Sequence, residues 1–240
     1  MAREKPDALW RAIHDNLQDD IAAGRYRPGD KLPTEAALAA RFDVNRHTVR
    51  RALAVLAEAG TIFARRGAGA FVAYRPSDYP IGRRVRFHQN LRAAGRLPAK
   101  EFLAMETRAA DADEAEMLGL EPGAAVHVCD GISRADGMPV GLFRSIFPAD
   151  RFPDLPEALR RLGSVTDALA AEGLADYTRA STRLTARLAS PLQARQLQLA
   201  PGAPLLRAVA VNVDASGCPV EYGRTWFAGE RITLTLMDSE

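Results

Sequence analysis

Apolar residues recur at helical spacing near the start of the chain. Leu9, Ile13 and Leu17 lie four positions apart, which is the spacing of one buried helix face, and Gly24 follows as a stop signal. Prolines and glycines then break the pattern over residues 27–33. The pattern predicts one amphipathic helix followed by a turn.

Two more helices are predicted before residue 60. Thr34 is a suitable N-cap for a short helix, and Asn45 can cap a third helix after a tight turn. The apolar positions of the third helix form one stripe: Val49, Ala52, Leu53 and Leu56. Basic side chains lie off this stripe, at Arg46, His47, Arg50 and Arg51.

Two short strands are predicted next, over residues 61–66 and 70–73, joined by a glycine-rich turn at residues 67–69. A helix-turn-helix followed by a hairpin is the winged helix-turn-helix pattern. Arginines on the third helix suit the major groove of DNA, and the hairpin tip suits the backbone or the minor groove. Taken alone, the third helix could equally be a surface helix with solvated arginines.

The distribution of charge weakly favours DNA binding over a solvated surface helix. The net charge is only +2, but residues 1–75 hold 13 basic against 9 acidic side chains, and six arginines lie between Arg41 and Arg66. Such a cluster matches a phosphate backbone. A nucleoid-type architectural protein would be more basic throughout the chain.

An internal repeat organises the rest of the sequence. Residues 118–123 recur 79 positions on at residues 197–202, and residues 137–140 recur as residues 217–220. Each unit is predicted as strand, short helix, strand, Gly-Pro turn and strand, with two helices between the units at residues 155–162 and 165–172. The predicted fold class is α+β, with a mainly antiparallel sheet whose halves are related by a pseudo-twofold.

The first part of the chain resembles the GntR family of regulators across residues 8–73. The matching stretches are residues 24–35, Leu38-Ala39, residues 44–53, residues 56–60 and residues 66–69. The resemblance implies DNA contacts from Lys31, Thr34, Arg46, His47, Thr48, Arg50, Arg51, Arg65, Arg66 and Gly67. Many members have an arginine where this chain has Ala36, so that phosphate contact is either missing or replaced by Lys31 and Arg41.

The C-terminal part resembles the effector (UTRA) domain of the HutC subfamily, whose fold is like that of chorismate lyase. The shared features are residues 118–123, residues 134–140, Ser145 before Pro148, and residues 219–222. Within the subfamily, residues 79–81, 86–87 and 90–91 most resemble regulators of phosphonate metabolism. Many relatives have arginines at the positions of Gly131 and Ser133, and here the nearest arginine is Arg134.

An anion pocket is the expected site in this domain, in the cleft between the two repeats. The candidate residues are Arg84, Arg86, Phe87, Arg134, Arg144, Ser145, Tyr177, Arg183, Glu221 and Tyr222, with Thr166 as a further hydroxyl. Guanidinium groups and hydroxyls suit a phosphate, phosphonate or carboxylate. Residues 83–86 could instead be a solvated face, and Glu221 either pairs with Arg224 or accepts hydrogen bonds from a hydroxylated or amino ligand.

No catalytic order of residues and no metal-ligand spacing is found, so no cofactor and no metal is expected. Cys129 and Cys218 are expected to be free thiols in a cytoplasmic protein that does not enter a membrane.

The sequence predicts a winged helix-turn-helix over residues 1–74, a linker over residues 75–82 and an effector domain over residues 83–240. The expected function is a homodimeric repressor that leaves double-stranded operator DNA when a small anionic effector binds. A phosphonate or phosphate metabolite is preferred, with a sugar phosphate or urocanate as alternatives. A lyase-like enzyme fused to a DNA-binding domain is a remote alternative.

Overall fold

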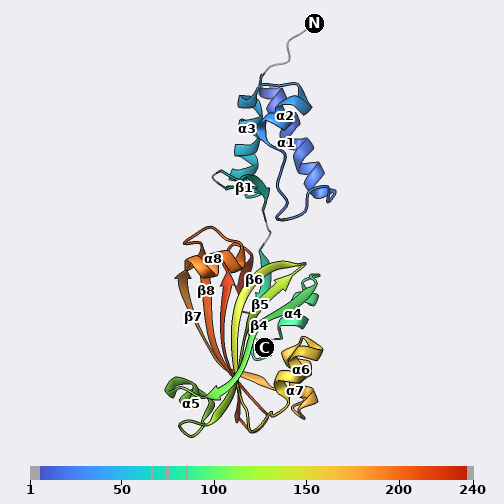
Figure 1. Cartoon of the computed structure of the whole chain (residues 1–240). Helices are drawn as coiled ribbons and strands as arrows, with labels where there is room; N and C mark the ends of the chain where they lie inside the picture. Colours follow the sequence, from blue (N-terminus) through green and yellow to red (C-terminus); the bar gives the residue numbers. More distant parts are fainter. Residues whose placement is uncertain (1–5, 66, 74–75, 85, 237–240) are drawn as a thin grey trace. The chain divides into compact units, whose positions relative to one another are not determined.

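The computed structural model describes residues 6–65, 67–73, 76–84 and 86–236. The chain divides into two compact units, residues 1–75 and residues 76–240. Each unit has its own buried core, and the two are described separately below (Figure 1).

The N-terminal unit consists of three helices and a hairpin. Its elements are α1 (Pro6–Ala22), α2 (Glu35–Phe42), α3 (Arg46–Glu58), β1 (Ile62–Arg65) and β2 (Gly69–Val72). The expected caps are both present: the Thr34 side chain accepts from the Ala37 N–H, and the Asn45 side chain accepts from the Thr48 N–H. Asp43 ends α2 in the left-handed conformation and makes the turn between the two helices.

The apolar stripes predicted for these helices meet in one cluster. Leu17 of α1, Leu38 of α2 and Val49 and Leu56 of α3 are fully buried there. The hairpin contributes Val72 to the same cluster. A two-stranded ribbon is barely stable alone, so the hairpin depends on this packing. This packing fixes the hairpin beside α3.

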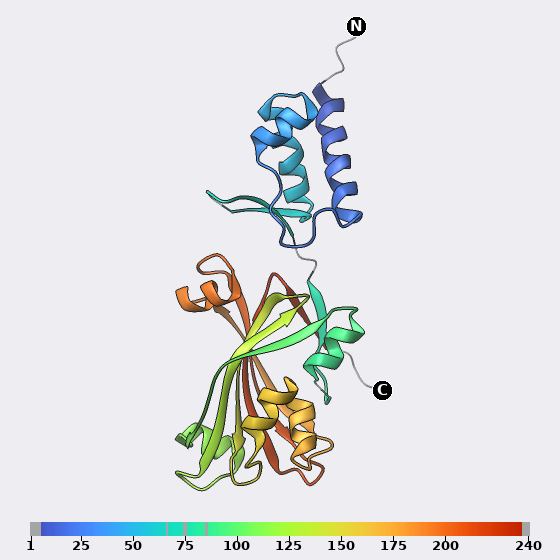
Figure 2. The same ribbon diagram turned by 45° about the vertical axis from the view of Figure 1, so that its right-hand side comes forward.

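The second unit is built on a six-stranded antiparallel sheet with the order β4-β5-β6-β9-β8-β7 (Figure 2). Its strands are β4 (Pro98–Ala109), β5 (Ala125–Ala135), β6 (Met138–Pro148), β7 (Thr178–Leu188), β8 (Pro204–Val213) and β9 (Pro219–Ala228). The helices that follow β4 and β7 are α5 (Ala112–Leu118) and α8 (Pro191–Leu197).

The predicted repeat and pseudo-twofold are confirmed by this order. β4, α5, β5 and β6 form one half, and β7, α8, β8 and β9 form the other. The halves meet where β6 pairs with β9, and Arg144 lies directly opposite Arg224, its counterpart in the repeat. Both short helices begin with a capping box, at Asp111 and at Ser190, 79 positions apart.

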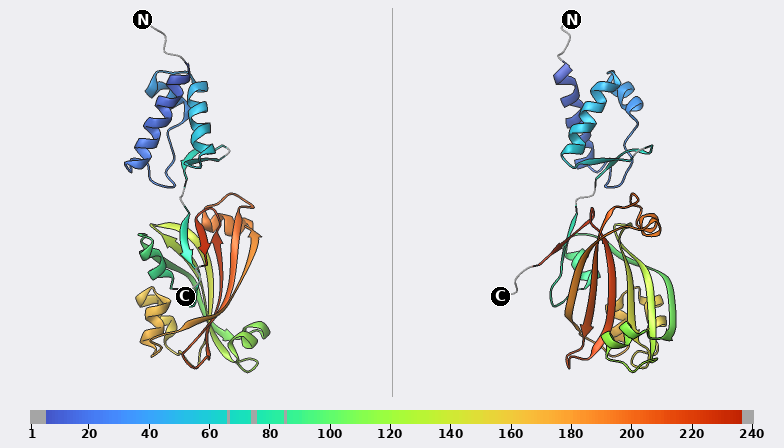
Figure 3. Two further views of the ribbon diagram at one scale, coloured as in Figure 1. Left: turned by 180° about the vertical axis from the view of Figure 1, so that it is seen from behind. Right: turned by 90° about the vertical axis from the view of Figure 1, so that its left-hand side faces the viewer.

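Different helices cover the two faces of the sheet (Figure 3). On one face, α6 (Leu155–Leu162) and α7 (Val165–Ala171) bury Leu159 and Leu169 against Cys129 and Phe147. On the other face, α5 packs Leu118 and α8 packs Leu197 over opposite ends of the strands. The alternation of side chains along each strand therefore decides which residues face which helices.

Three elements of the second unit were not predicted. Residues 77–80, expected in the linker, form β3 (Ser77–Pro80), which pairs in parallel with β10 (Ile232–Thr235). α4 (Phe87–Ala93) follows and packs on β3 and β4. The linker prediction was too long because Tyr79 and Ile81 join the core around Phe227, so this segment gains more from burial than a solvated linker would.

Within the described ranges, no helix is long and apolar enough to span a bilayer.

Candidate functional site

A hollow in the N-terminal unit lies between α3 and the hairpin. It brings together four residues that the sequence assigned to DNA contact: Lys31, Thr34, Arg50 and Gly67. Gly67 has a φ of 76°, so the tight turn at the hairpin tip depends on a residue without a side chain. The hollow joins α3 and the hairpin into one surface.

The exposed side of α3 carries the predicted basic residues. Arg46, His47, Arg50 and Arg51 are exposed, and Thr48 is half-buried with its hydroxyl donating to Asn45 Oδ1 at 3.1 Å. The guanidinium of Arg51 lies 4.8 Å from the centre of the Trp10 ring. At the hairpin, Arg65 belongs to β1 and Arg66 lies outside the described residues.

Arg50 is held by a carboxylate in this structure. Its Nη2 donates to Glu35 Oε2 at 2.8 Å and its Nε donates to Glu35 Oε1 at 3.2 Å. The hydrogen bond from Arg50 is the main reason that the pKa of Glu35 lies below its ordinary value. A bidentate pair fixes the plane of the guanidinium, which is the group that would face a guanine edge.

Arg41, considered for a phosphate contact, is hydrogen-bonded within the N-terminal unit. Its Nη2 donates to Asp20 Oδ2 at 3.1 Å and to Asn16 Oδ1 at 2.9 Å. Asp20 is only 2% exposed and also accepts from Arg25. Lys31, the other candidate for that contact, is exposed and lines the hollow.

The second unit contains a cavity of about 100 Å³ on the sheet face that also carries α6 and α7. Its walls come from β3, α4, the start of α7 and all six strands of the sheet. The lining residues used below are Tyr79, Phe87, His88, Lys100, Phe143, Ser145, Thr166, Tyr177, Arg179, Asn212, Glu221 and Gly223.

Glu221 is the only carboxylate among the cavity-lining residues. Ser145 Oγ donates to its Oε1 at 2.6 Å, and Asn212 Nδ2 donates to its Oε2 at 2.6 Å. Arg179 Nε donates in turn to Asn212 Oδ1 at 2.7 Å. The sequence left open a pair between Glu221 and Arg224, and the structure places Arg224 on the opposite face, where its Nε donates to the Tyr222 hydroxyl at 3.3 Å.

Lys100 brings an ammonium group to the same cavity. Its Nζ lies 3.9 Å from the centre of the Phe143 ring and 5.8 Å from that of Phe87, so the cation rests on aromatic faces. Burial lowers the pKa of Lys100, and the negative charge of Glu221 works against that shift. His88 lines the cavity too, and burial together with the nearby charge of Lys100 lowers its pKa.

The two cations of the cavity occupy equivalent places in the repeat. Lys100 lies opposite Ser133 on the neighbouring strand, and Arg179 lies opposite Asn212. Each residue of the second pair comes 79 positions after its counterpart in the first. Among lining residues, two basic side chains, Lys100 and Arg179, therefore accompany one carboxylate. The balance of charge favours an anion.

The structure brings together four of the predicted effector residues: Phe87, Ser145, Tyr177 and Glu221. Arg86 lies behind them, with its guanidinium 4.1 Å from the centre of the Tyr177 ring and its Nη2 donating to Asp176. Arg84 also donates to Asp176, from an exposed position.

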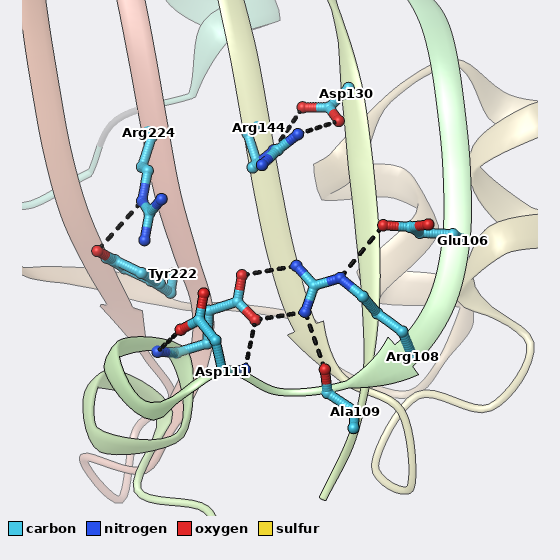
Figure 4. Close-up of polar contacts among 9 residues, drawn as sticks. Glu106, Arg108, Ala109, Asp111, Asp130, Arg144, Tyr222 and Arg224 are labelled. Atoms are coloured by element: carbon cyan, nitrogen blue, oxygen red, sulfur yellow. Dashed lines mark hydrogen bonds and ion pairs between the residues drawn. The ribbon is translucent and has the colours of Figure 1, made fainter. Parts of the chain in front are cut away.

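The other four predicted effector residues do not line the cavity. Figure 4 shows Arg144 and Tyr222 on the face of the sheet that carries α5, where Arg144 forms a bidentate pair with Asp130. Arg134 donates to Glu101, and Arg183 is exposed on β7. Arg144 and Ser145 are neighbours in one strand, so their side chains must point to opposite faces.

Sequence reasoning missed Lys100, Arg179 and Asn212. Two signals could have found them: the equivalence of Lys100 with Arg179 in the repeat, and the register that puts these side chains on the face of Ser145. Within the described ranges, no group of three His, Cys, Asp or Glu side chains could hold a metal ion. Cys129 and Cys218 are free thiols, and burial raises the pKa of Cys129 to about 12.

A winged helix-turn-helix joined to a sheet domain with a polar cavity defines the class of transcription regulators that carry a separate sensing domain. Residues 9–72 match the family described as bacterial regulatory proteins of the gntR family, and residues 93–233 match the UTRA domain. The chain belongs to the GntR family and is of the HutC-like type with a UTRA domain.

Relatives cover almost the whole chain. It is 36% identical to a probable transcriptional regulator of Escherichia coli (strain K12), PhnF, over 95% of this chain and 94% of that protein. It is 30% identical to the transcriptional repressor PhnF of Mycolicibacterium smegmatis, over 94% and 89%. The crystal structure of PhnF from Mycobacterium smegmatis matches with a TM-score of 0.67 and 28% identity, over 96% of this chain and 99% of that one. These similarities identify a regulator and not an enzyme.

Proposed function

We propose that this protein is a homodimeric repressor that leaves its operator when a small anion, of the phosphonate or phosphate type, binds in the cavity of the second unit. The observation that carries the proposal is the charge of the cavity, in which Lys100 and Arg179 face the single carboxylate of Glu221. The relative from Mycolicibacterium smegmatis is named a transcriptional repressor, which supports the repressor role. The resemblance of residues 79–81, 86–87 and 90–91 to regulators of phosphonate metabolism supports the choice of anion. Since an operator is part of the chromosome, the proposal places the protein in the cytoplasm.

On the DNA side, α3 supplies the base readers. We assign the major groove to Arg46 and Arg50, and the phosphate backbone to Lys31, Thr34, His47, Thr48 and Arg51. The hairpin with Arg65, Arg66 and Gly67 would enter the minor groove. Two copies related by a twofold would read two half-sites one helical turn apart, which is why we infer a dimer.

The polypeptide chain itself connects the cavity in the second unit to the DNA-binding unit. The chain enters the second unit at residue 76 and continues directly into β3. Tyr79 in this strand and Ile81 just after it line the cavity. A ligand that packs on these residues acts on the segment that connects the units. Complete release needs a large difference in affinity between the two states, roughly 5.5 kcal/mol for a change from 1:99 to 99:1.

A sugar phosphate is the second candidate. The cavity offers hydroxyl and amide groups at Ser145, Thr166 and Asn212, which could bind sugar hydroxyls. A carboxylate such as urocanate would use the same cations.

The test uses the full-length protein and an operator selected by it from a pool of random duplexes. Fluorescence anisotropy would follow the complex while phosphate, alkylphosphonates, glucosamine 6-phosphate or urocanate is added. We expect a phosphonate to release the DNA from the wild type and to fail with Lys100→Met, which removes the charge but keeps the length of the side chain. Release that is equal in the variant, or no release by any of these anions, would refute the proposal. Sedimentation of the full chain as a monomer at micromolar concentration would refute the dimer.

A further inference from the structure

The cavity contains a carboxylate, Glu221, and an ammonium group, Lys100, and these two groups do not form an ion pair with each other. Both oxygens of Glu221 accept from neutral donors, Ser145 and Asn212. The Lys100 ammonium rests on the Phe143 ring. Among the described residues, neither of the two charged groups takes part in an ion pair.

Each group keeps unused binding capacity. A carboxylate has about four lone-pair positions, and the hydrogen bonds from Ser145 and Asn212 use two of those of Glu221. An aromatic face attracts an ammonium but accepts no conventional hydrogen bond from it, so the three N–H donors of Lys100 suit an anion. A ligand that occupies these unused positions forms charge-assisted hydrogen bonds, which are stronger than hydrogen bonds between neutral groups.

The strands keep the two charges in their places. Lys100 is on β4 at one edge of the sheet, and Glu221 is on β9 with β5 and β6 between them. Ser145 and Asn212, from the strands on either side of β9, clamp the carboxylate. A ligand that satisfies both groups must carry two charges of its own.

Size narrows the ligand further. A dry protein cavity of about 150 Å³ is known to hold benzene, and this cavity measures about 100 Å³. The two volumes are of the same order, so the cavity suits a small organic molecule.

We propose that the effector is a small zwitterion, whose anionic group binds Lys100 and whose primary ammonium group binds Glu221. This inference rests on the proposed function and specifies its ligand. Glu221 reads the amine, and Ser145 and Asn212 are positioning residues that orient its two oxygens. An alkyl anion would leave the carboxylate facing an apolar group, and a hydroxylated anion would offer it only a neutral donor, so both bind less tightly than the amine.

Isothermal titration calorimetry of the full-length protein can test the amine with three phosphonates of nearly equal shape. These are 2-aminoethylphosphonate, 2-hydroxyethylphosphonate and ethylphosphonate, with β-alanine and propionate as a carboxylate pair. We expect the amine-bearing member to bind roughly 10- to 100-fold more tightly than its partners, which is the range for a hydrogen bond to a charged group. Glu221→Gln keeps the size of the side chain and should abolish this preference.

Asp130→Asn is the matched control, because Asp130 is a carboxylate of the same sheet that pairs with Arg144 on the other face. It should leave the amine preference intact. Lys100→Met should weaken all the anions together, with or without an amine.

Two results would overturn the zwitterion. One is equal affinity for the amino, hydroxy and plain phosphonates, and the other is an amine preference that survives in Glu221→Gln. If ethylphosphonate releases operator DNA as well as 2-aminoethylphosphonate does, the proposed function stands and only this inference fails. If no member of either series binds, both fail.

Discussion

Gly131 lies on β5 where the Phe143 ring crosses it. A Cβ added at this glycine would meet Glu101 O at 2.3 Å, Phe143 Cζ at 2.5 Å and Phe143 Cε1 at 2.7 Å. The first contact is with the backbone of the neighbouring strand, which cannot turn away. The second is with the ring that supports Lys100 in the cavity. Gly131→Ala therefore tests packing and site together.

The expected cost follows from two opposing effects. Replacing glycine with alanine inside a strand normally stabilises by about 0.5–1 kcal/mol through chain entropy. Overpacking of a filled core costs about 1–3 kcal/mol and occasionally more. Because one of the clashes is with backbone, we place the overpacking cost at about 2–3 kcal/mol, which leaves a net loss of about 1–2.5 kcal/mol. For a unit of 165 residues this lowers Tm by roughly 2–10 °C.

Differential scanning calorimetry of the full chain would measure this change. Gly223→Ala is the matched control: it lies in β9 of the same sheet, and its added Cβ would approach Glu221 Oε1 and Ala210 O no closer than 3.7 Å and 4.0 Å. We expect Tm to be unchanged or slightly raised in the control. Equal Tm values for Gly131→Ala and the wild type would show that the strand and ring yield freely, and the packing argument would be wrong.

Three further predictions concern other parts of the chain. Arg50→Ala should weaken operator binding by roughly 1–3 kcal/mol and relax specificity at one base pair per half-site, measured by gel shift against scrambled DNA; unchanged affinity would remove Arg50 from the readers. Asp20→Asn should destabilise the N-terminal unit by about 1–3 kcal/mol in urea unfolding at neutral pH. Burial alone would raise the pKa of Asp20, but hydrogen bonds from Arg41 and Arg25 bring it below 3.8. The stabilisation is therefore present above that pH and is lost as the pH falls through the lower folded-state pKa. A difference in stability between wild type and variant that persists in acid would contradict this. Cys129 should resist iodoacetamide at pH 8 in the folded protein while Cys218 reacts, since Cys129 is buried with a pKa of about 12; mass spectrometry showing equal labelling would be the contrary result.

The N-terminal unit was predictable from sequence almost element by element. Its caps, turn and stripe are local features, and Thr34, Asn45 and Val49 have the roles that their neighbours in sequence suggest. The strands, the helices around residues 155–172 and the pseudo-twofold of the second unit were also predictable, because the repeat fixes their order.

The effector site was predicted only in part, because membership of the site depends on which face of the sheet a side chain takes. Arg144 and Ser145 were assigned together, and the pleat separates them. Lys100 carries no local signal, since its role depends on rings contributed by α4 and β6. β3 was missed because its partner, β10, lies more than 150 positions away.

The pseudo-twofold points to an ancestral duplication, after which one copy diverged. A symmetric ancestor would have offered its ligand the same groups from both halves and could have bound it in two orientations. Glu221 occupies the place that Gly141 has in the other half, 80 positions earlier. A side chain at Gly141 would press on Trp226 O, 3.2 Å from the position of its Cβ. Steric crowding at Gly141 therefore leaves room for a carboxylate in one half alone, so the two ends of the cavity present different groups to a ligand.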